Sequence, residues 1–177
     1  MAPVTSLLLA IATVCCLVAE SAAGPCIFRE GQHQVIYGIR NGVVHIRIII
    51  RGLPQTASGW TGIGFGNGML DGLDTIIVRV SNGRVNVSDE YVRGYTSSFP
   101  DRINNVVVHS RRVEDEVISV TFSRPVNSME YPYDMSLVGC VPWKFLIGLS
   151  RMGPRGELHH HSVTPVHRTV CIDECRI

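Results

Sequence analysis

Short runs in which apolar and polar residues alternate recur along this chain, and they limit the folds that it can form. In residues 43–51, Ile46 and Ile48 fall on one side of an extended chain, while His45 and Arg47 fall on the other. Successive side chains of a β-strand point to opposite faces, so this period of two is typical of a strand buried on one face. The pattern recurs in residues 74–80, 84–92, 104–112 and 115–124.

Turn-forming residues separate these segments. Asn41-Gly42 and Asn82-Gly83 indicate tight hairpins, because a type I′ turn needs positive φ at both central residues. A third turn is expected around Val113-Glu114-Asp115, and later strands in residues 143–150 and 162–173. No stretch of helix length shows a 3.6-residue period. We therefore predict an all-β fold, an antiparallel immunoglobulin-like β-sandwich of about 8–11 strands.

The chain begins with a segment typical of a secretory signal peptide, predicted for residues 1–23. Its apolar run from Leu7 to Ala19 is shorter than the about 20 residues that a membrane-spanning helix needs, and small residues lead up to Ala23. A buried N-terminal helix is the alternative. No later segment is long and apolar enough to cross a membrane. We expect a secreted, extracellular protein with no transmembrane anchor and a single domain over residues 24–177.

Four cysteines follow the predicted signal peptide: Cys26, Cys140, Cys171 and Cys175. An even number in an oxidising compartment predicts two disulfides. In an extended chain Cys171 and Cys175 would lie about 13 Å apart, too far for a direct bond. We therefore expect each to pair with Cys26 or Cys140, without choosing between the two arrangements. Zinc binding is the alternative, but the chain has no CxxC motif.

The balance of charges and one short motif bear on possible partners and modifications. The chain has 16 Lys and Arg against 15 Asp and Glu, so no strong attraction to nucleic acid or anionic lipid is expected. The triplet Asn86-Val87-Ser88 is a sequon for N-glycosylation at Asn86.

Glycine occupies every second position in one stretch, WTGIGFGNG, residues 60–68. The spacing matches neither GxGxxG nor GxxxxGK[ST], so we exclude nucleotide binding. At the strand period, one face carries only Trp60 and the glycines, and a large ligand can approach such a face closely. The alternative is that neighbouring side chains fill the space. The predicted ligand-facing residues are Trp60, Gly62, Gly64, Gly66 and Gly68, followed by Met69 in a turn.

The order of these motifs resembles the DOMON domain. The set comprises the glycine strand with the Met after it, Asp74 before the next strand, residues 87–101, residues 121–127, and Trp143 with a late histidine. DOMON domains are extracellular β-sandwiches found in dopamine β-monooxygenase relatives and in the cytochrome domain of cellobiose dehydrogenase. The resemblance extends over about residues 30–165.

The resemblance implies a ligand-binding domain that takes haem in some members and sugars in others. In haem-binding members a Met after the glycine strand and a late His ligate the iron. Met69 matches the first position, and His159, His160 or His161 the second. Because side chains alternate, we expect His159 and His161 to share a face opposite His160, and we favour His161, then His159. No CxxCH is present, so the haem would be b-type, with both axial positions filled, and would transfer electrons to an unidentified redox partner.

Other interpretations remain open. The same fold, without haem, would serve as a carbohydrate- or small-ligand-binding or adhesion module. A copper or zinc site of Met69, His159 and His161 is weaker, since no further ligand completes a first shell. We expect Phe65 and Trp143 to pack in the core rather than line a pocket, and Arg124 and Arg151 to lie on the surface rather than meet haem propionates. No catalytic motif is present, and we expect no enzymatic activity.

Overall fold

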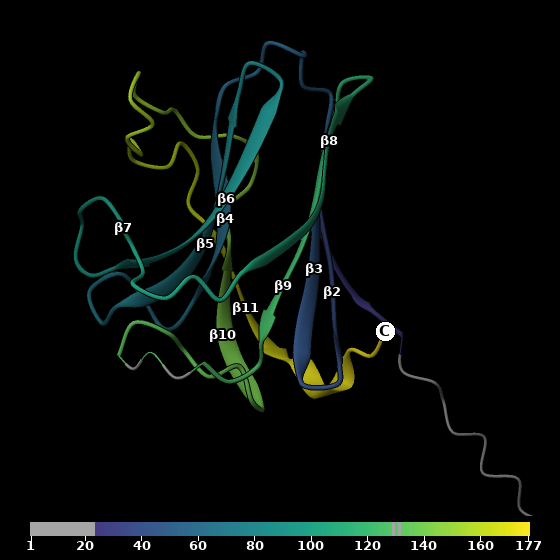
Figure 1. Cartoon of the computed structure of the whole chain (residues 1–177), viewed down its shortest axis with the longest axis vertical. Helices are drawn as coiled ribbons and strands as arrows, with labels where there is room; N and C mark the ends of the chain where they lie inside the picture. The colour runs from purple at the N-terminus through teal and green to yellow at the C-terminus, as the bar shows by residue number, and fades with distance from the viewer. Residues whose placement is uncertain (1–23, 129, 131) are drawn as a thin grey trace, which may run out of the picture.

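The fold is a sandwich of two antiparallel β-sheets, seen in a computed structural model that describes residues 24–128, 130 and 132–177 (Figure 1). The five-stranded sheet has the order β1-β2-β3-β9-β8, and the six-stranded sheet β11-β10-β4-β5-β6-β7. The predicted all-β sandwich is confirmed, while the predicted signal peptide lies outside the described residues. The strands are β1 (Cys26–Glu30), β2 (His33–Arg40), β3 (Val43–Arg51), β4 (Gly59–Phe65), β5 (Leu73–Ser81), β6 (Arg84–Val92), β7 (Phe99–Pro100), β8 (Val107–Glu114), β9 (Val117–Pro125), β10 (Cys140–Phe145) and β11 (Val166–Cys171).

The tight hairpins form where the turn residues tolerate positive φ. Asn41-Gly42 has φ of 52° and 73°, and Asn82-Gly83 has φ of 50° and 72°, as a type I′ turn requires. The third turn consists of Asp115-Glu116, with φ of 50° and 60°, so its expected centre at Val113-Glu114-Asp115 is wrong. Pairing continues to the Glu114–Val117 pair, and only the two residues beyond it are left to turn the chain.

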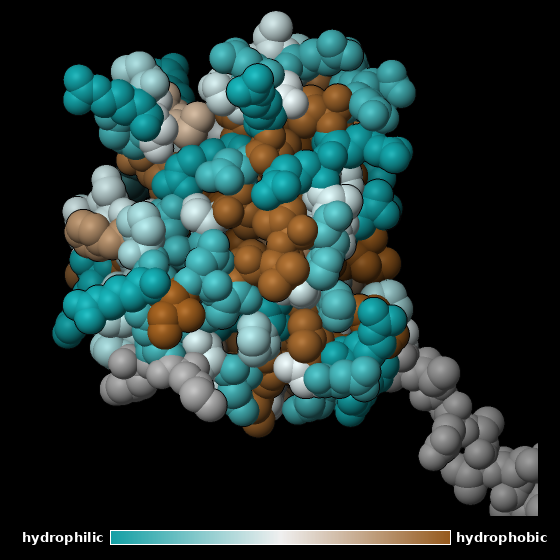
Figure 2. All heavy atoms as spheres, viewed as in Figure 1, coloured by the Kyte–Doolittle hydropathy of each residue, from teal (hydrophilic) through white to brown (hydrophobic). Residues whose placement is uncertain are grey.

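The hydrophobic core fills the space between the sheets. Ile46 and Ile48 of β3 are 1% exposed, which confirms the predicted buried face, and Phe65 and Trp143 of the opposite sheet are fully buried. Figure 2 shows apolar side chains gathered in a band between the sheets, with hydrophilic residues on either side. Burial of each large side chain contributes about 1.5–3 kcal/mol. The expected core positions of Phe65 and Trp143 are therefore confirmed.

Two disulfides fasten the C-terminal segment to the sandwich. Cys26 bonds to Cys175, and Cys140 bonds to Cys171 across the β10–β11 pair. Each of Cys171 and Cys175 pairs with a distant cysteine, as expected. The assumption of an extended chain between them is wrong, because the 3-10 helix η1 (Ile172–Glu174) lies there. In the part of the chain that the structure describes, no helix is long and apolar enough to span a membrane.

His33 is an ionisable residue on the buried face of β2. It is 2% exposed, and its Nδ1 accepts a hydrogen bond of 3.3 Å from the backbone N–H of Gly148. Burial lowers the pKa of His33 to about 4, because desolvation disfavours the imidazolium. The folded protein therefore holds this ring neutral under mildly acidic conditions, whereas the unfolded chain protonates it.

We predict that His33→Gln makes the free energy of unfolding less sensitive to acidification. The folded pKa of His33 lies below its unfolded value, so its contribution is complete above about pH 6.5 and is lost as the pH falls towards 4. Between pH 7 and pH 5 the wild type should lose about 2 kcal/mol more than the variant. Urea denaturation at both pH values measures this difference.

The acid sensitivity of His33→Gln has to be compared with that of the wild type, because other groups also titrate between pH 5 and pH 7. Burial raises the pKa of Asp89 and of Asp101 to about 7, which favours the folded state on acidification in both proteins alike. His109→Gln on the exposed strand β8 is the control and should follow the wild type. Equal acid sensitivity of His33→Gln and the wild type would contradict the assignment.

Candidate functional site

The candidate site lies on the outer face of the six-stranded sheet, over β4. This strand pairs with β10 on one side and β5 on the other. Ile63 and Phe65 point into the core, whereas Trp60, Gly62 and Gly64 line a cavity outside the sheet. The predicted division of this strand into a bulky face and a bare face is therefore present along β4 itself.

The bare face is shorter than the sequence suggested. β4 ends at Phe65, and Gly66 leaves the strand with φ of 126°, so the alternation does not continue to Gly68. A Cβ on Gly66 would lie 3.1 Å from the carbonyl oxygen of Gly72 and 3.4 Å from Met135. Gly66 does not line the cavity. Gly68 does, because the following turn brings it back to the rim.

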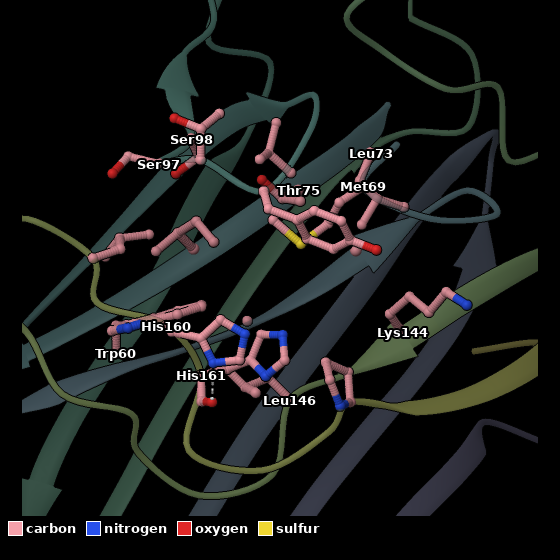
Figure 3. Close-up of a pocket in the computed structure, with 18 of the residues that line it drawn as sticks. Trp60, Met69, Leu73, Thr75, Ser97, Ser98, Lys144, Leu146, His160 and His161 are labelled. Carbon is pink, nitrogen blue, oxygen red and sulfur yellow. Dashed lines mark hydrogen bonds between the residues drawn. The ribbon is translucent and has the colours of Figure 1, made fainter. Parts of the chain in front are cut away.

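The cavity has a volume of about 640 Å³. Its floor is the outer face of β4, β5 and β10, including Leu73, Thr75 and Lys144, and its walls are three loop segments, residues 68–69, 95–98 and 158–165. Figure 3 shows Met69 on one side of the cavity, near Leu73 and Thr75, and His160 and His161 on the other side, near Leu146. Cofactor pockets commonly fall between about 300 and 1,000 Å³.

The two floor glycines serve different purposes. A Cβ on Gly62 would lie 2.5 Å from the backbone carbonyl of Ile76, so the neighbouring strand itself requires glycine there. A Cβ on Gly64 would meet Leu73, Lys144 and Thr75 at ordinary contact distances of 3.5 to 3.6 Å. Packing within the sheet therefore requires glycine at position 62, whereas a small side chain would fit at position 64.

Met69 stands in the turn between β4 and β5 at the rim of the cavity. Its carbonyl oxygen accepts a hydrogen bond of 2.5 Å from the N–H of Gly94. This bond ties the Met69 turn to the loop after β6, which carries Tyr95 and the hydroxyls of Ser97 and Ser98 to the cavity. Ser98 in turn donates a hydrogen bond to Glu90 on β6. These hydrogen bonds fix the turn that carries Met69 relative to the loop after β6 and to β6 itself.

All three consecutive histidines line the cavity. The prediction that His160 opposes the other two is wrong, because residues 158–162 form no strand and do not alternate. The segment is anchored through its backbone: the indole Nε1 of Trp60 donates to the carbonyl of His159 at 3.1 Å, and Ser150 Oγ accepts from the N–H of Ser162 at 3.0 Å.

The surroundings of the three rings distinguish His161. Its Nδ1 is buried without a hydrogen-bond partner among the described residues, and desolvation, followed by the nearby charge of His160, lowers the pKa of His161. The ring of His160 lies 4.2 Å from that of His161. The ring of His159 lies beside a neighbouring turn: a Cβ added to Gly153 would be 3.3 Å from Nε2 of His159. Desolvation therefore favours the neutral form of the His161 ring.

Lys144 is a cavity residue that the sequence interpretation missed. It is the only lysine of the chain and sits directly opposite Gly64 in the β10–β4 pair. Its Nζ lies 2.7 Å from Nδ1 of His167. The alternation of Trp143, Lys144 and Phe145 predicts that Lys144 faces outward, but not which strand lies beside it. A ligand in this cavity would meet a cation here.

The expected surface position of Arg124 is wrong. Its side chain is fully buried, donates to Asp74 Oδ2 at 2.6 Å, and lies over the ring of Phe65 at 5.1 Å. Burial raises the pKa of Asp74, and the guanidinium of Arg124 opposes that rise. Arg124 belongs to the core face of β9 and does not line the cavity. Arg151 is exposed, as expected, and does not line it either.

Comparisons with a family model and with solved structures agree with this architecture. The family model of the DOMON domain matches residues 29–150. The cytochrome b domain of pyranose dehydrogenase from Coprinopsis cinerea superposes with a TM-score of 0.66 at 11% identity, covering 85% of this chain and 83% of that one. The cytochrome domain of Myriococcum thermophilum cellobiose dehydrogenase gives 0.61 at 12% identity, covering 86% and 91%. No curated protein sequence matches the chain.

We predict opposite tolerances for alanine at the two floor glycines. Gly62→Ala should lower the free energy of unfolding by about 1–3 kcal/mol, because the new methyl group overlaps the backbone of β5. Gly64→Ala, the matched substitution two residues along the same strand, should change it by less than about 0.5 kcal/mol. Thermal or urea denaturation measures both. Equal destabilisation by the two substitutions would contradict the assignment of free space above Gly64.

Proposed function

The chain belongs to the DOMON domain family, and from this premise we propose that it is an extracellular b-type haem protein that transfers electrons. Met69 and His161 are the residues that would hold its iron. The two solved structures described above are cytochrome domains. The two disulfides and the predicted signal peptide support an oxidising, extracellular location. The proposed role is non-catalytic.

One observation carries the proposal: a thioether and an imidazole line the same cavity, above a floor that includes an unobstructed glycine. Met69 lies on one side and His161 on the other (Figure 3). Nδ1 of His161 is buried with no hydrogen-bond partner among the described residues. Sulfur and imidazole nitrogen are both donors that iron accepts.

The remaining lining residues fit a flat, largely apolar cofactor with anionic substituents. Leu73, Ile77 and Leu146 supply apolar surface beside Gly64. Lys144 supplies a cation that would attract a carboxylate. The cavity volume of about 640 Å³ suits a group of this size. A CxxCH motif is absent from the sequence, so the cofactor would be held without covalent attachment.

Haem bound here would supply a one-electron redox couple. Met69 and His161 would hold it from two sides, which leaves no coordination position for oxygen or a substrate. The soft thioether favours the reduced metal and raises the potential relative to two imidazoles. Tyr95, 80% exposed, lines the same cavity and is accessible to a redox partner.

A haem-free carbohydrate-binding or small-ligand-binding module is the second candidate. Trp60 and Tyr95 place aromatic rings at the same cavity, and Thr75, Ser97 and Ser98 add hydroxyl groups. A pocket that combines apolar surface with a few polar groups also suits a sugar. The two candidates share the cavity but differ in whether the thioether and the imidazole are needed.

We predict that the purified or haem-reconstituted protein shows a Soret band and, on reduction, sharp α and β bands. Met69→Leu and His161→Ala should each abolish the six-coordinate spectrum, and His161→Ala should weaken haem binding at least about tenfold. Haem titration followed by absorbance measures both. Met152→Leu and His109→Ala, which change the same residue types at positions that do not line the cavity, should retain the wild-type spectrum.

The remaining histidines complete the test. His159→Ala and His160→Ala should keep the six-coordinate spectrum, and loss of the spectrum in only one of these two would reassign the ligand. A wild-type protein that takes up no haem, while binding an oligosaccharide on a glycan array, would replace the first candidate by the second.

A further inference from the structure

Three buried carboxylates converge on the core side of the six-stranded sheet, on the face opposite the cavity. Asp74 of β5, Asp89 of β6 and Asp134 of the segment before β10 are 3%, 3% and 7% exposed. One oxygen from each lies within 4.8 Å of the others. They come from three separate parts of the chain, so tertiary folding brings them together.

Each of these carboxylates has one oxygen that accepts hydrogen bonds and one that accepts none from the described residues, although Oδ1 of Asp134 lies 3.7 Å from the guanidinium of Arg124. The Oδ2 atoms accept hydrogen bonds: Asp74 from Arg124 and from the N–H of Met135 at 2.8 Å, Asp89 from the N–H of Asn105 at 3.1 Å, and Asp134 from Nδ2 of Asn105 at 2.8 Å. Among the described residues, all three Oδ1 atoms are buried with no hydrogen-bond partner. Buried polar atoms are normally hydrogen-bonded, so three neighbouring carboxylates that each keep an oxygen without a hydrogen bond from the described chain require an explanation.

Two further unpaired oxygens belong to the same neighbourhood. Oδ1 of Asn105 is buried and unpartnered within the described chain, while the amide nitrogen of that side chain donates to Ser128 and Asp134. Oδ2 of Asp101 is likewise buried and unpartnered. The backbone N–H of Asp101 donates to the carbonyl of Asp89 at 3.1 Å, which keeps the two residues adjacent.

The charges in this cluster do not balance. Asp74, Asp89, Asp101 and Asp134 carry four potential negative charges, and Arg124 contributes one positive charge through ion pairs of 2.6 Å to Asp74 and 3.7 Å to Asp134. Buried like charges repel strongly in a low dielectric, and an uncompensated buried carboxylate is costly. A positive ligand bound among the free oxygens would relieve both the repulsion and the missing coordination.

We propose that Asp74, Asp89 and Asp134, with Asn105 and Asp101 beside them, form a calcium-binding site. All candidate donors are oxygens, which hard cations prefer and zinc does not. Opposite oxygens around Ca²⁺ lie about 4.6–5.2 Å apart, so donors within 4.8 Å of one another fit one coordination sphere. Mg²⁺ needs a smaller octahedron, of about 4.1 Å across, and usually keeps several waters.

Calcium would join three segments that the sheet alone does not connect. Asp74 is the second residue of β5, Asp101 and Asn105 lie between β7 and β8, and Asp134 lies between β9 and β10. The flanking residues Leu73 and Thr75 line the cavity on the other face of the sheet. The site acts on the stability of the domain and does not depend on the proposed haem binding.

The experiment uses haem-free protein treated with a chelator and then titrated with CaCl₂ or MgCl₂. Calcium should raise the melting temperature and give a saturable binding heat by calorimetry, with Mg²⁺ at least tenfold weaker. Asp89→Asn and Asp134→Asn should each weaken calcium binding at least tenfold. Asp115→Asn, on an exposed hairpin turn, is the matched control and should retain the full response.

The test does not depend on the variants folding, because experiments on the wild type alone decide whether the protein binds calcium. Metal analysis of protein purified without chelator should find about one calcium per chain. A chelated wild type with no calcium response, in the melting temperature or in calorimetry, would overturn the proposal and show that protons neutralise the cluster. An equal calcium response in Asp89→Asn and the wild type would also overturn it.

Discussion

The arrangement of this protein depends on the one-sided distribution of side chains along β4. Ile63 and Phe65 anchor the strand in the core, so their face cannot turn outward without exposing a large apolar area. The opposite face then has to present Trp60, Gly62 and Gly64 away from the core. The cavity exists because this outer face carries little bulk at Gly64, and the walls around it are loops held to the sheet.

Pairing of β10 with β4 connects this floor to the candidate ligands. The register places Lys144 opposite Gly64 and Trp143 opposite Phe65, so one strand contributes to the cavity and to the core in alternate positions. After Phe145 the chain leaves the sheet and returns, and Ser150 pairs with Trp60. That return carries residues 158–165 over the floor, to the side away from Met69.

The core side of the same sheet also contains charged residues. There, Arg124 and the carboxylates of Asp74 and Asp134 form a buried polar cluster beside the apolar core. Such a cluster costs free energy unless its atoms are hydrogen-bonded, and each of these two carboxylates keeps one buried oxygen without a hydrogen bond from the described residues. The sheet therefore separates two chemically distinct sites, an open cavity outside and a polar cluster inside, connected through the short segment from Leu73 to Thr75.

The amino-acid sequence by itself determined the features that follow from local periodicity. Alternation predicted the strands and their buried faces, Asn-Gly pairs predicted two hairpins, and the bare face of β4 was recognisable from the glycine spacing. The pairing of Cys171 and Cys175 with distant cysteines was also foreseen, although the helix between them was not. These features depend on residues close together in the chain.

Only the tertiary structure decided what lies beside what. The burial of Arg124 depends on Asp74, 50 positions away, and nothing in the local pattern of β9 indicates a buried cation. Lys144 enters the cavity because β10 pairs with β4, and all three late histidines reach it because an irregular loop, not a strand, carries them. Contacts between distant segments are set by packing and register across the sheets, and no local period in the sequence encodes them.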